Sequence, residues 1–416
     1  MSSSEVVLET KAQQGLNSSV VPSDIEGLAE SRSRGSQRFD RTPLLVFWET
    51  TKACPLSCQH CRAQAIANAL PGELSTDEGK DLIRQITGFE NPSPILVLSG
   101  GDVLMRPDAL ELVAFARSKK VRVAISPTVS DCLNDQLIGE LYGLGVRSVS
   151  ISLDGIGDRH DHIRGVAGHF EQSVDAIRRL VAAGFSVQVN TTVMSITVGD
   201  LAAVVELLIS LGVRIWEVFF LIQVGRGKAL GELSPAENED VARFLYLASS
   251  YGLLVRTVEG PFFRRVAVNI KNPSLGTRDI LPPGDLYNSL EADLTSRLGG
   301  PTSLPRLPAT ATRDGKGIIF VAHDGNVFPS GFLEISLGNV RLTPLAEIYR
   351  DHPLLRAIRS GSFTGRCGDC RYKDLCGGSR SRAFAHFGDP LAEDPGCSYH
   401  PPESVNDSYR SEALTL

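Results

Sequence analysis

Six short apolar segments alternate with helical segments along the chain, and this alternation limits the possible folds more than any other feature of the sequence. A βα alternation of this length predicts an α/β fold whose parallel sheet forms a barrel or partial barrel. One predicted helix begins at Ser75, where Ser75-Thr-Asp-Glu78 is typical of a capping box. The predicted strands are 44–48, 95–98, 122–126, 148–153, 186–193 and 215–221, and the other predicted helices are 108–118, 134–142, 170–183, 198–211 and 235–250.

Small or polar residues follow each predicted strand. In barrels of this type the chemistry lies at the carboxyl ends of the strands. A Gly-Gly pair after one strand is usually only a turn, but six such ends around one rim together predict a ligand site. The strand ends are a cysteine loop, then Ser-Gly-Gly-Asp at 99–102, Ser-Pro-Thr at 126–128, Ser-Leu-Asp-Gly at 152–155, Asn-Thr-Thr at 190–192 and Gln-Val-Gly-Arg-Gly at 223–227.

The cysteine loop after the first strand reads Cys54-Pro-Leu-Ser-Cys58-Gln-His-Cys61. Three thiolates this close together can hold three irons of a cubane cluster and leave the fourth iron open for chemistry. A structural zinc site usually draws its ligands from two CxxC pairs, or from one pair and two histidines. The motif therefore indicates a reactive iron-sulfur site, while zinc with His60 as a fourth ligand and fortuitous cysteines remain the alternatives.

The motif and the strand ends resemble those of the radical SAM enzymes over about residues 44–400. The resemblance implies a partial (β/α)6 barrel and a [4Fe-4S] cluster whose open iron is chelated by S-adenosylmethionine. It also implies an oxidoreductase or lyase-type activity: the reduced cluster cleaves S-adenosylmethionine, and the resulting 5'-deoxyadenosyl radical abstracts hydrogen from a substrate.

The same resemblance assigns S-adenosylmethionine contacts to several strand ends. Gly100-Gly101-Asp102 looks like the GGE element that meets the methionine amino group, with a side chain one methylene shorter than glutamate. The segment 160–165, His-Asp-His-Ile-Arg-Gly, looks like an HDxxRG segment, to which we assign capping and ion pairing. No catalytic acid or base is assigned. The other cofactor contacts implied are Ser126, Ser152, Asp154 and Asn190.

A second cysteine cluster lies near the C-terminus. Spacing alone allows either zinc or an iron-sulfur cluster there. The segment resembles the SPASM extension, which implies one auxiliary [4Fe-4S] cluster with full protein ligation. Ser330 and Arg380 stand where that pattern has cysteines of a further cluster, so we expect only one. Its task would be electron transfer, or only holding the tail folded. The implied ligands are Cys367, Cys370, Cys376 and Cys397.

Several expectations concern the whole chain of 416 residues. The net charge of -6 argues against a nucleic-acid partner. No apolar stretch is long enough for a membrane span, and grouped cysteines favour a cytoplasmic metalloprotein. The remaining cysteine, Cys132, is expected to be buried in the core. The predicted domains are an arm (1–43, disordered), the radical SAM barrel (44–260), a linker or covering segment (261–310), the SPASM-like iron-sulfur domain (311–400) and a tail (401–416).

The substrate is expected to be a small molecule or a peptide. The segments 47–54 and 60–63 look most similar to the tetrapyrrole-modifying enzymes of haem b and haem d1 biosynthesis. Arg226 and Arg264-Arg265 could then bind carboxylates, although ordinary surface and core positions are the favoured explanation. Maturases of ribosomally made peptides are the alternative, but the residues before the first strand are too few for their recognition module. An electron donor such as flavodoxin or ferredoxin is expected, and a non-catalytic electron carrier is the third hypothesis.

Overall fold

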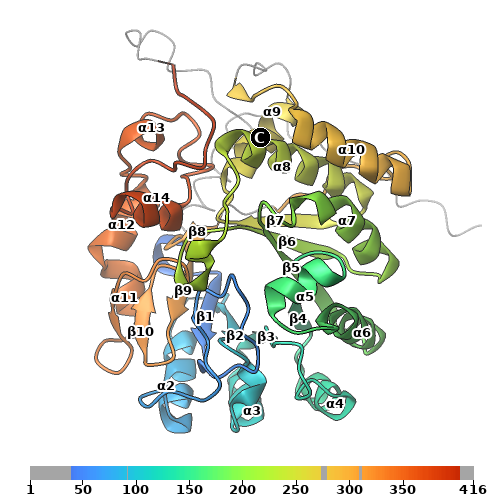
Figure 1. Ribbon diagram of the computed structural model, residues 1–416. Coiled ribbons are helices and arrows are strands. Elements are labelled where there is room, and N and C mark those ends of the chain that lie inside the picture. The colour runs from blue at the N-terminus through green and yellow to red at the C-terminus, as the bar shows by residue number, and fades with distance from the viewer. Residues whose placement is uncertain (1–38, 91, 273–278, 309–311, 403–416) are drawn as a thin grey trace, which may run out of the picture.

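The computed structural model describes residues 39–90, 92–272, 279–308 and 312–402. Most of the predicted arm (1–43) and tail (401–416) lies outside these ranges. One sheet runs through the described residues in the order β11-β10-β9-β1-β2-β3-β4-β5-β6-β7, with β8 paired to β9. Its two ends do not meet, so the sheet is an open arc with helices around it (Figure 1).

The predicted parallel barrel is confirmed, and each predicted strand is present to within one residue at either end. Every pair of neighbours from β1 to β7 is parallel. β7 is a seventh barrel strand that the sequence analysis missed, because Arg256 and Thr257 interrupt its apolar pattern. The barrel strands are β1 (Leu45–Glu49), β2 (Ile95–Ser99), β3 (Arg122–Ile125), β4 (Ser148–Ser152), β5 (Ser186–Val193), β6 (Ile215–Phe220) and β7 (Leu254–Val258).

The two faces of the sheet differ in burial. Along β5 every second residue, from Val187 to Val193, is buried, whereas Gln188 and Asn190 between them are only half-buried. Helices cover the outer face of a βα barrel, so the half-buried residues line the inside of the arc. The inner face is therefore the accessible one, and any ligand held by the strands would lie there.

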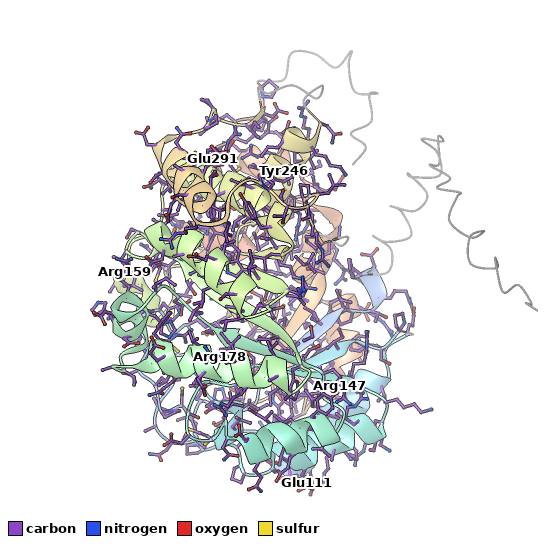
Figure 2. The ribbon with its side chains drawn as sticks, turned by 90° about the vertical axis from the view of Figure 1, so that its right-hand side faces the viewer. Glu111, Arg147, Arg159, Arg178, Tyr246 and Glu291 are labelled. Carbon is purple, nitrogen blue, oxygen red and sulfur yellow. The ribbon has the colours of Figure 1, made fainter. Side chains whose placement is uncertain are left out.

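The predicted helices are also confirmed. Ser75 and Glu78 form the expected capping box at the start of α2 (Thr76–Thr87), with both reciprocal hydrogen bonds present. Exposed side chains of this outer layer, such as Glu111 and Arg178, point away from the sheet (Figure 2). The other helices are α3 (Ala109–Ser118), α4 (Asp135–Gly143), α5 (Asp158–Arg164), α6 (His169–Ala182), α7 (Leu201–Ser210) and α8 (Pro235–Ala248).

Two helices lie in the described part of 261–310, the segment predicted to be a linker or covering segment. α9 (Phe262–Lys271) packs on α8, and α10 (Asp285–Leu298) packs on α7 and α8, so this segment belongs to the barrel wall (Figure 1). α10 buries only Leu290 and Leu294 among polar residues. Two buried apolar residues do not give a recognisable helical pattern in the sequence, and prolines and glycines flank the segment.

The C-terminal region extends the barrel sheet. β9 (Gly317–Val321) pairs in parallel with β1, and β10 (Asn326–Phe328) turns back against β9 to form a hairpin. β8 (Arg313–Asp314) and β11 (Gly338–Asn339) are short edge pieces. The helices here are α11 (Leu345–Asp351), α12 (Pro353–Ser360), α13 (Gly365–Gly368) and α14 (Arg380–Phe387).

None of the helices formed by the described residues combines the length and the apolar character that crossing a membrane requires.

Candidate active site

The cysteine loop after β1 is held in place by main-chain contacts from the far side of the arc. Arg226, just after β6, donates its backbone N–H to the carbonyl of Cys61 (3.1 Å), its Nε to the carbonyl of Cys58 (2.8 Å) and Nη1 to that of Ala65 (3.1 Å). A side chain at Gly225 would collide with the carbonyl of Cys61, so glycine permits this close approach. The loop is thus fixed before any cofactor binds. Nε and Nη1 of Arg226 are used for this task, whereas Nη2 is buried without a hydrogen-bond partner, and binding of a substrate carboxylate there stays a prediction.

The loop places its three thiols among hydrogen-bond donors. Cys54 and Cys58 are buried and Cys61 is half-buried, and all three are free. The backbone N–H of Leu56 lies 3.5 Å from the Sγ of Cys54, and Nη1 of Arg164 lies 3.6 Å from the Sγ of Cys58. Burial raises the pKa of the Cys54 thiol, so a bound metal must displace its proton. Three thiols with such donors, and no fourth cysteine in the loop, fit a cluster with one open iron.

A buried ion-pair network joins this loop to β4 and α5. Asp154 contacts Arg164 at 2.6 Å and His60 at 3.1 Å, and it accepts a hydrogen bond from the N–H of Thr192 (2.7 Å). Burial disfavours the charged form, but Arg164 and His60 outweigh it and hold the pKa of Asp154 far below its usual range. Asp154 is 1% exposed. Its carboxylate therefore orients the loop, and its contact with S-adenosylmethionine stays a prediction.

The segment 160–165 has the roles that its sequence predicts. Asp161 accepts hydrogen bonds from the N–H groups of Gly168 and Phe170 and so caps α6. Nδ1 of His160 accepts from the N–H of Asp154 (3.0 Å). With the Arg164 ion pair, these contacts confirm the expected capping and ion pairing.

Gly100 and Gly101 bring the end of β2 against the start of the cysteine loop. The N–H of Gly101 donates to the carbonyl of Thr51 (2.8 Å), and the N–H of Asp102 donates to that of Ala53 (2.7 Å). A Cβ at Gly100 or Gly101 would lie 2.4 or 2.3 Å from those same oxygens, and Gly100 also has φ +142°. The two glycines are thus required for main-chain packing, whatever ligand the loop holds.

The side chain of Asp102 points into the protein interior. Its carboxylate accepts hydrogen bonds from the N–H of Leu104 (3.1 Å), the N–H of Thr128 (3.3 Å) and Oγ of Ser130 (2.9 Å). The side chain is completely buried, and burial raises its pKa. The short carboxylate folds back onto its own turn, and its contact with the methionine amino group stays a prediction. It instead holds the hydroxyl of Thr128 3.7 Å from the Sγ of Cys54, so we assign it a positioning role.

The three remaining predicted contacts, Ser126, Ser152 and Asn190, lie half-buried at the carboxyl ends of β3, β4 and β5. Oδ1 of Asn190 accepts from Nε2 of Gln188 (2.8 Å). This placement keeps all three available on the accessible side of the strands. Their contact with S-adenosylmethionine stays a prediction.

Polar residues further inside the arc were missed by the sequence analysis. Nε2 of Gln188 donates to Glu217 on β6 (2.8 Å), and Oε1 of Gln188 accepts from Arg256 on β7 (3.3 Å). Burial raises the pKa of Glu217 against the opposing charge of Arg256. The signal was present in the sequence: a polar residue at every second position of an otherwise apolar strand marks an accessible inner face.

Arg62 brings a further cation to this face, next to Cys61. Its guanidinium lies 4.6 Å from the ring centre of Phe320 and 5.9 Å from that of Phe332, and it contacts Glu49. Phe332 also contacts Phe219 of β6, so this group spans the arc from the cysteine loop to β6. The arginine is 17% exposed, and its charge is opposed by Glu49 at 3.4 Å.

The four C-terminal cysteines line one cavity at the start of α14. The N–H of Asp394 and Nη2 of Arg380 reach the Sγ of Cys367 at 3.3 and 3.5 Å. Burial raises the pKa of Cys370 to about 11. One thiol from each of Cys367, Cys370, Cys376 and Cys397 lines this cavity, as a cluster with four protein ligands would require.

Three other sequence-based interpretations are corrected. Cys132 is exposed and not a core residue, because it lies in the loop before α4. Arg264 donates to the carbonyls of Leu375 and Thr312, and Arg265 forms a buried ion pair with Glu239 at 2.7 Å. Neither arginine is free for a substrate carboxylate, since both fasten α9 to its neighbours.

Comparisons with known proteins agree with this geometry. Residues 48–208 match the Radical SAM superfamily. The chain is 35% identical to the AdoMet-dependent heme synthase of Nitratidesulfovibrio vulgaris (86% of this chain, 92% of that protein) and 31% to the Fe-coproporphyrin III synthase of Methanosarcina barkeri (86% and 88%). It is 29% identical to the mycofactocin maturase MftC of Mycobacterium ulcerans (85% and 88%). Streptococcus suis SuiB bound to its precursor peptide SuiA has a similar fold, with TM-score 0.62 and 15% identity over 94% of this chain and 84% of SuiB.

Proposed function

Because this chain belongs to the radical SAM superfamily, we propose that it modifies the carboxylate side chains of an iron tetrapyrrole. Enzymes of this superfamily use a [4Fe-4S] cluster and S-adenosylmethionine. When bound, these groups supply a 5'-deoxyadenosyl radical that removes a hydrogen atom from the substrate. The chain's own residues must therefore hold the two cofactors, orient the substrate and keep water away from the radical.

We assign cofactor binding to the rim of the arc. Cys54, Cys58 and Cys61 would hold the cluster on the loop that Arg226 and Gly225 fix in place. Ser126, Ser152 and Asn190 would contact S-adenosylmethionine at the neighbouring strand ends. Asp102 and Asp154 act through other residues: Asp102 orients Thr128 beside Cys54, and Asp154 orients Arg164 beside Cys58.

The observation that carries the substrate assignment is Arg62, a half-buried cation stacked on Phe320 one residue after Cys61. A tetrapyrrole offers both a flat aromatic face and carboxylates, and an arginine held against phenylalanine rings matches that combination. Arg256 would supply a second cation deeper in the arc. Greater identity to the heme and Fe-coproporphyrin III synthases than to the peptide maturase supports the same choice.

Titration of the anaerobic protein with Fe-coproporphyrin III, followed at the Soret band, tests this assignment. We expect saturable binding that weakens about tenfold or more in Arg62→Gln, since a buried charge-assisted hydrogen bond contributes roughly 1.5 to 3 kcal/mol. The tetramethyl ester of the same porphyrin should bind weakly to both proteins. Lys228→Gln, at a more exposed cation, is the matched control and should bind like the unmodified protein. Equal affinity for the acid and the ester would contradict the assignment.

The second candidate function is maturation of a ribosomally made peptide. It is favoured by the similarity to MftC, which extends over 88% of that protein, and by the fold shared with SuiB. Incubation with S-adenosylmethionine and dithionite separates both enzyme functions from an electron carrier, because only an enzyme forms 5'-deoxyadenosine. Acceleration of that reaction by the porphyrin supports the tetrapyrrole substrate, and no acceleration counts against it.

We assign electron transfer to the four-cysteine cavity. A cluster with four protein ligands has no open iron for substrate. Its environment of buried arginines, Arg265 and Arg380 among them, favours the added negative charge of a reduced cluster. A small redox protein such as flavodoxin or ferredoxin would then supply or accept the electron.

A further inference from the structure

Two buried carboxyl groups meet where the last barrel strand touches the C-terminal region. Glu259 directly follows β7, and Asp314 ends β8. Ser379 and Ser381 reach them from the start of α14, and all four residues are buried. None of them contacts the cysteines or the inner-face residues described above, so the proposed reaction leaves this cluster unexplained.

Glu259 occupies its place under conformational strain. Its φ is +58°, a left-handed conformation that costs energy for any residue with a Cβ. The next residue, Gly260, packs against the ring of Phe220, where a side chain would collide. A non-glycine residue kept in such a turn indicates that its side chain has a task there.

The hydrogen bonds around Ser381 require a bound proton. Its Oγ lies 2.8 Å from Oε1 of Glu259 and 2.8 Å from Oδ2 of Asp314. A hydroxyl has one hydrogen and can donate to only one of two carboxylates. The second contact is a hydrogen bond only if that carboxyl group is protonated and donates to the serine oxygen. One proton therefore completes the chain from Glu259 through Ser381 to Asp314, and Ser379 donates to the other oxygen of Glu259.

The neighbouring charged groups do not neutralise both carboxylates. Arg382 donates Nη1 to the backbone carbonyl of Glu259 and to Asp394 (3.2 Å), and it also faces Glu232 (3.6 Å). Arg380 faces Asp314 but directs its hydrogen bonds to the carbonyls of Pro390 and Ala392 and to Cys367. Burial, together with the charge of Asp314, raises the pKa of Glu259 to about 8, and burial also raises the pKa of Asp314.

We propose that Glu259, Asp314 and Ser381 form a proton-binding site that holds one proton at neutral pH and fastens the C-terminal region to β7. Ser330, where the SPASM pattern has a cysteine, lies 3.4 Å from Ser381. A network of hydroxyl and carboxyl groups thus joins the hairpin to α14 at the place where the resemblance expects a metal cluster. This site is independent of the substrate that the barrel binds.

The proton makes stability depend on pH with a definite sign. A carboxyl group whose pKa is raised on folding stabilises the folded state fully below its ordinary pKa, 4.5 for glutamate, and loses that contribution as the pH rises towards 8. The unfolding temperature of the anaerobic holoprotein should therefore fall by roughly 2 to 5 °C between pH 6 and pH 8.5 through this site alone.

Glu259→Gln tests the sign of this pH dependence. Its amide can donate to Ser381 and accept from Ser379, as a protonated acid does. Its unfolding temperature should fall less than that of the unmodified protein over the same pH range. Glu140→Gln, at an exposed carboxylate paired only with Gln136, should retain the full fall. If the unfolding temperature of Glu259→Gln falls with pH as much as that of the unmodified protein, the proposal is overturned.

Infrared difference spectroscopy on the unmodified protein tests the proton directly and needs no variant to fold. A protonated carboxyl stretch should be present at pH 7, shift in D2O and decrease by pH 9.5. The difference between the spectra of the unmodified protein and Glu259→Gln at pH 7 should contain this band. Absence of any protonated carboxyl band from the unmodified protein at pH 7 would also overturn the proposal.

Discussion

At the scale of single residues, the shape of the candidate site depends on buried charged side chains that contact other protein groups. Arg164 faces a cysteine sulfur because Asp154 holds it there, and both groups are buried. Burying a charge costs several kcal/mol unless a partner remains beside it. Such pairs therefore fix the shape of a site more strictly than exposed ion pairs do, and they are sensitive to the loss of either member.

Asp154→Asn tests this dependence. We expect it to lower the free energy of unfolding by about 3 kcal/mol or more, since it leaves Arg164 buried without a counter-charge. The backbone hydrogen bond from Thr192 can survive, because the amide oxygen still accepts. Anaerobic denaturant unfolding measures the change. Asp175→Asn, which removes an exposed partner of Arg179, is the control and should cost less than about 1 kcal/mol. An equal loss of unfolding free energy in the two variants would contradict the stronger dependence on the buried pair.

The residue scale also shows what a motif cannot predict. Gly100-Gly101-Asp102 fixes a position at the end of β2, but the direction of the carboxylate is set by donors at Thr128 and Ser130, far along the chain. Gln188, Glu217 and Arg256 were recognisable only as polar residues in apolar strands. Which of them meet depends on the register of β5, β6 and β7, and no local pattern states that register.

At the scale of elements, local signals succeeded where one segment decides its own structure. The capping box at Ser75 fixes the start of α2 through contacts within four residues. β7 and α10 were missed because neighbours stabilise them: β7 completes hydrogen bonds with β6, and α10 buries two leucines against α7 and α8. Tertiary contacts outweigh propensity in both.

The contact between two loop elements provides a test. Gly101→Ala would place a methyl group 2.3 Å from the carbonyl oxygen of Ala53, so we expect destabilisation by at least about 2 kcal/mol and a displaced cysteine loop. Thermal unfolding measures the first effect, and the iron content of the purified protein measures the second. Gly139→Ala is the control, since its methyl group meets nothing within 4 Å in α4 and should be neutral or stabilising by up to about 1 kcal/mol. Similar behaviour of the two variants would exclude close packing as the reason for Gly101.

At the scale of the whole molecule, the two cysteine groups should act as separate metal centres. We expect about eight irons per chain from two [4Fe-4S] clusters, and about four after Cys367→Ala combined with Cys370→Ala. Cys132→Ala, at the exposed cysteine, should retain about eight. Iron, sulfide and zinc analysis of anaerobic protein decides the matter. About twelve irons would contradict the single auxiliary cluster, and about four irons with one zinc would assign the C-terminal cavity to zinc.

The pairing of Leu45 in β1 with Ile318 in β9 has a consequence for biosynthesis. A ribosome delivers β1 early, but one flank of that strand stays open until residue 321 of 416 has been translated. Closing so long a loop is slow, and an unpaired flank can associate with other nascent chains in the meantime. The loop proposed to hold the first iron-sulfur cluster follows this same strand, so maturation of that centre in the cell would depend on the synthesis of β9.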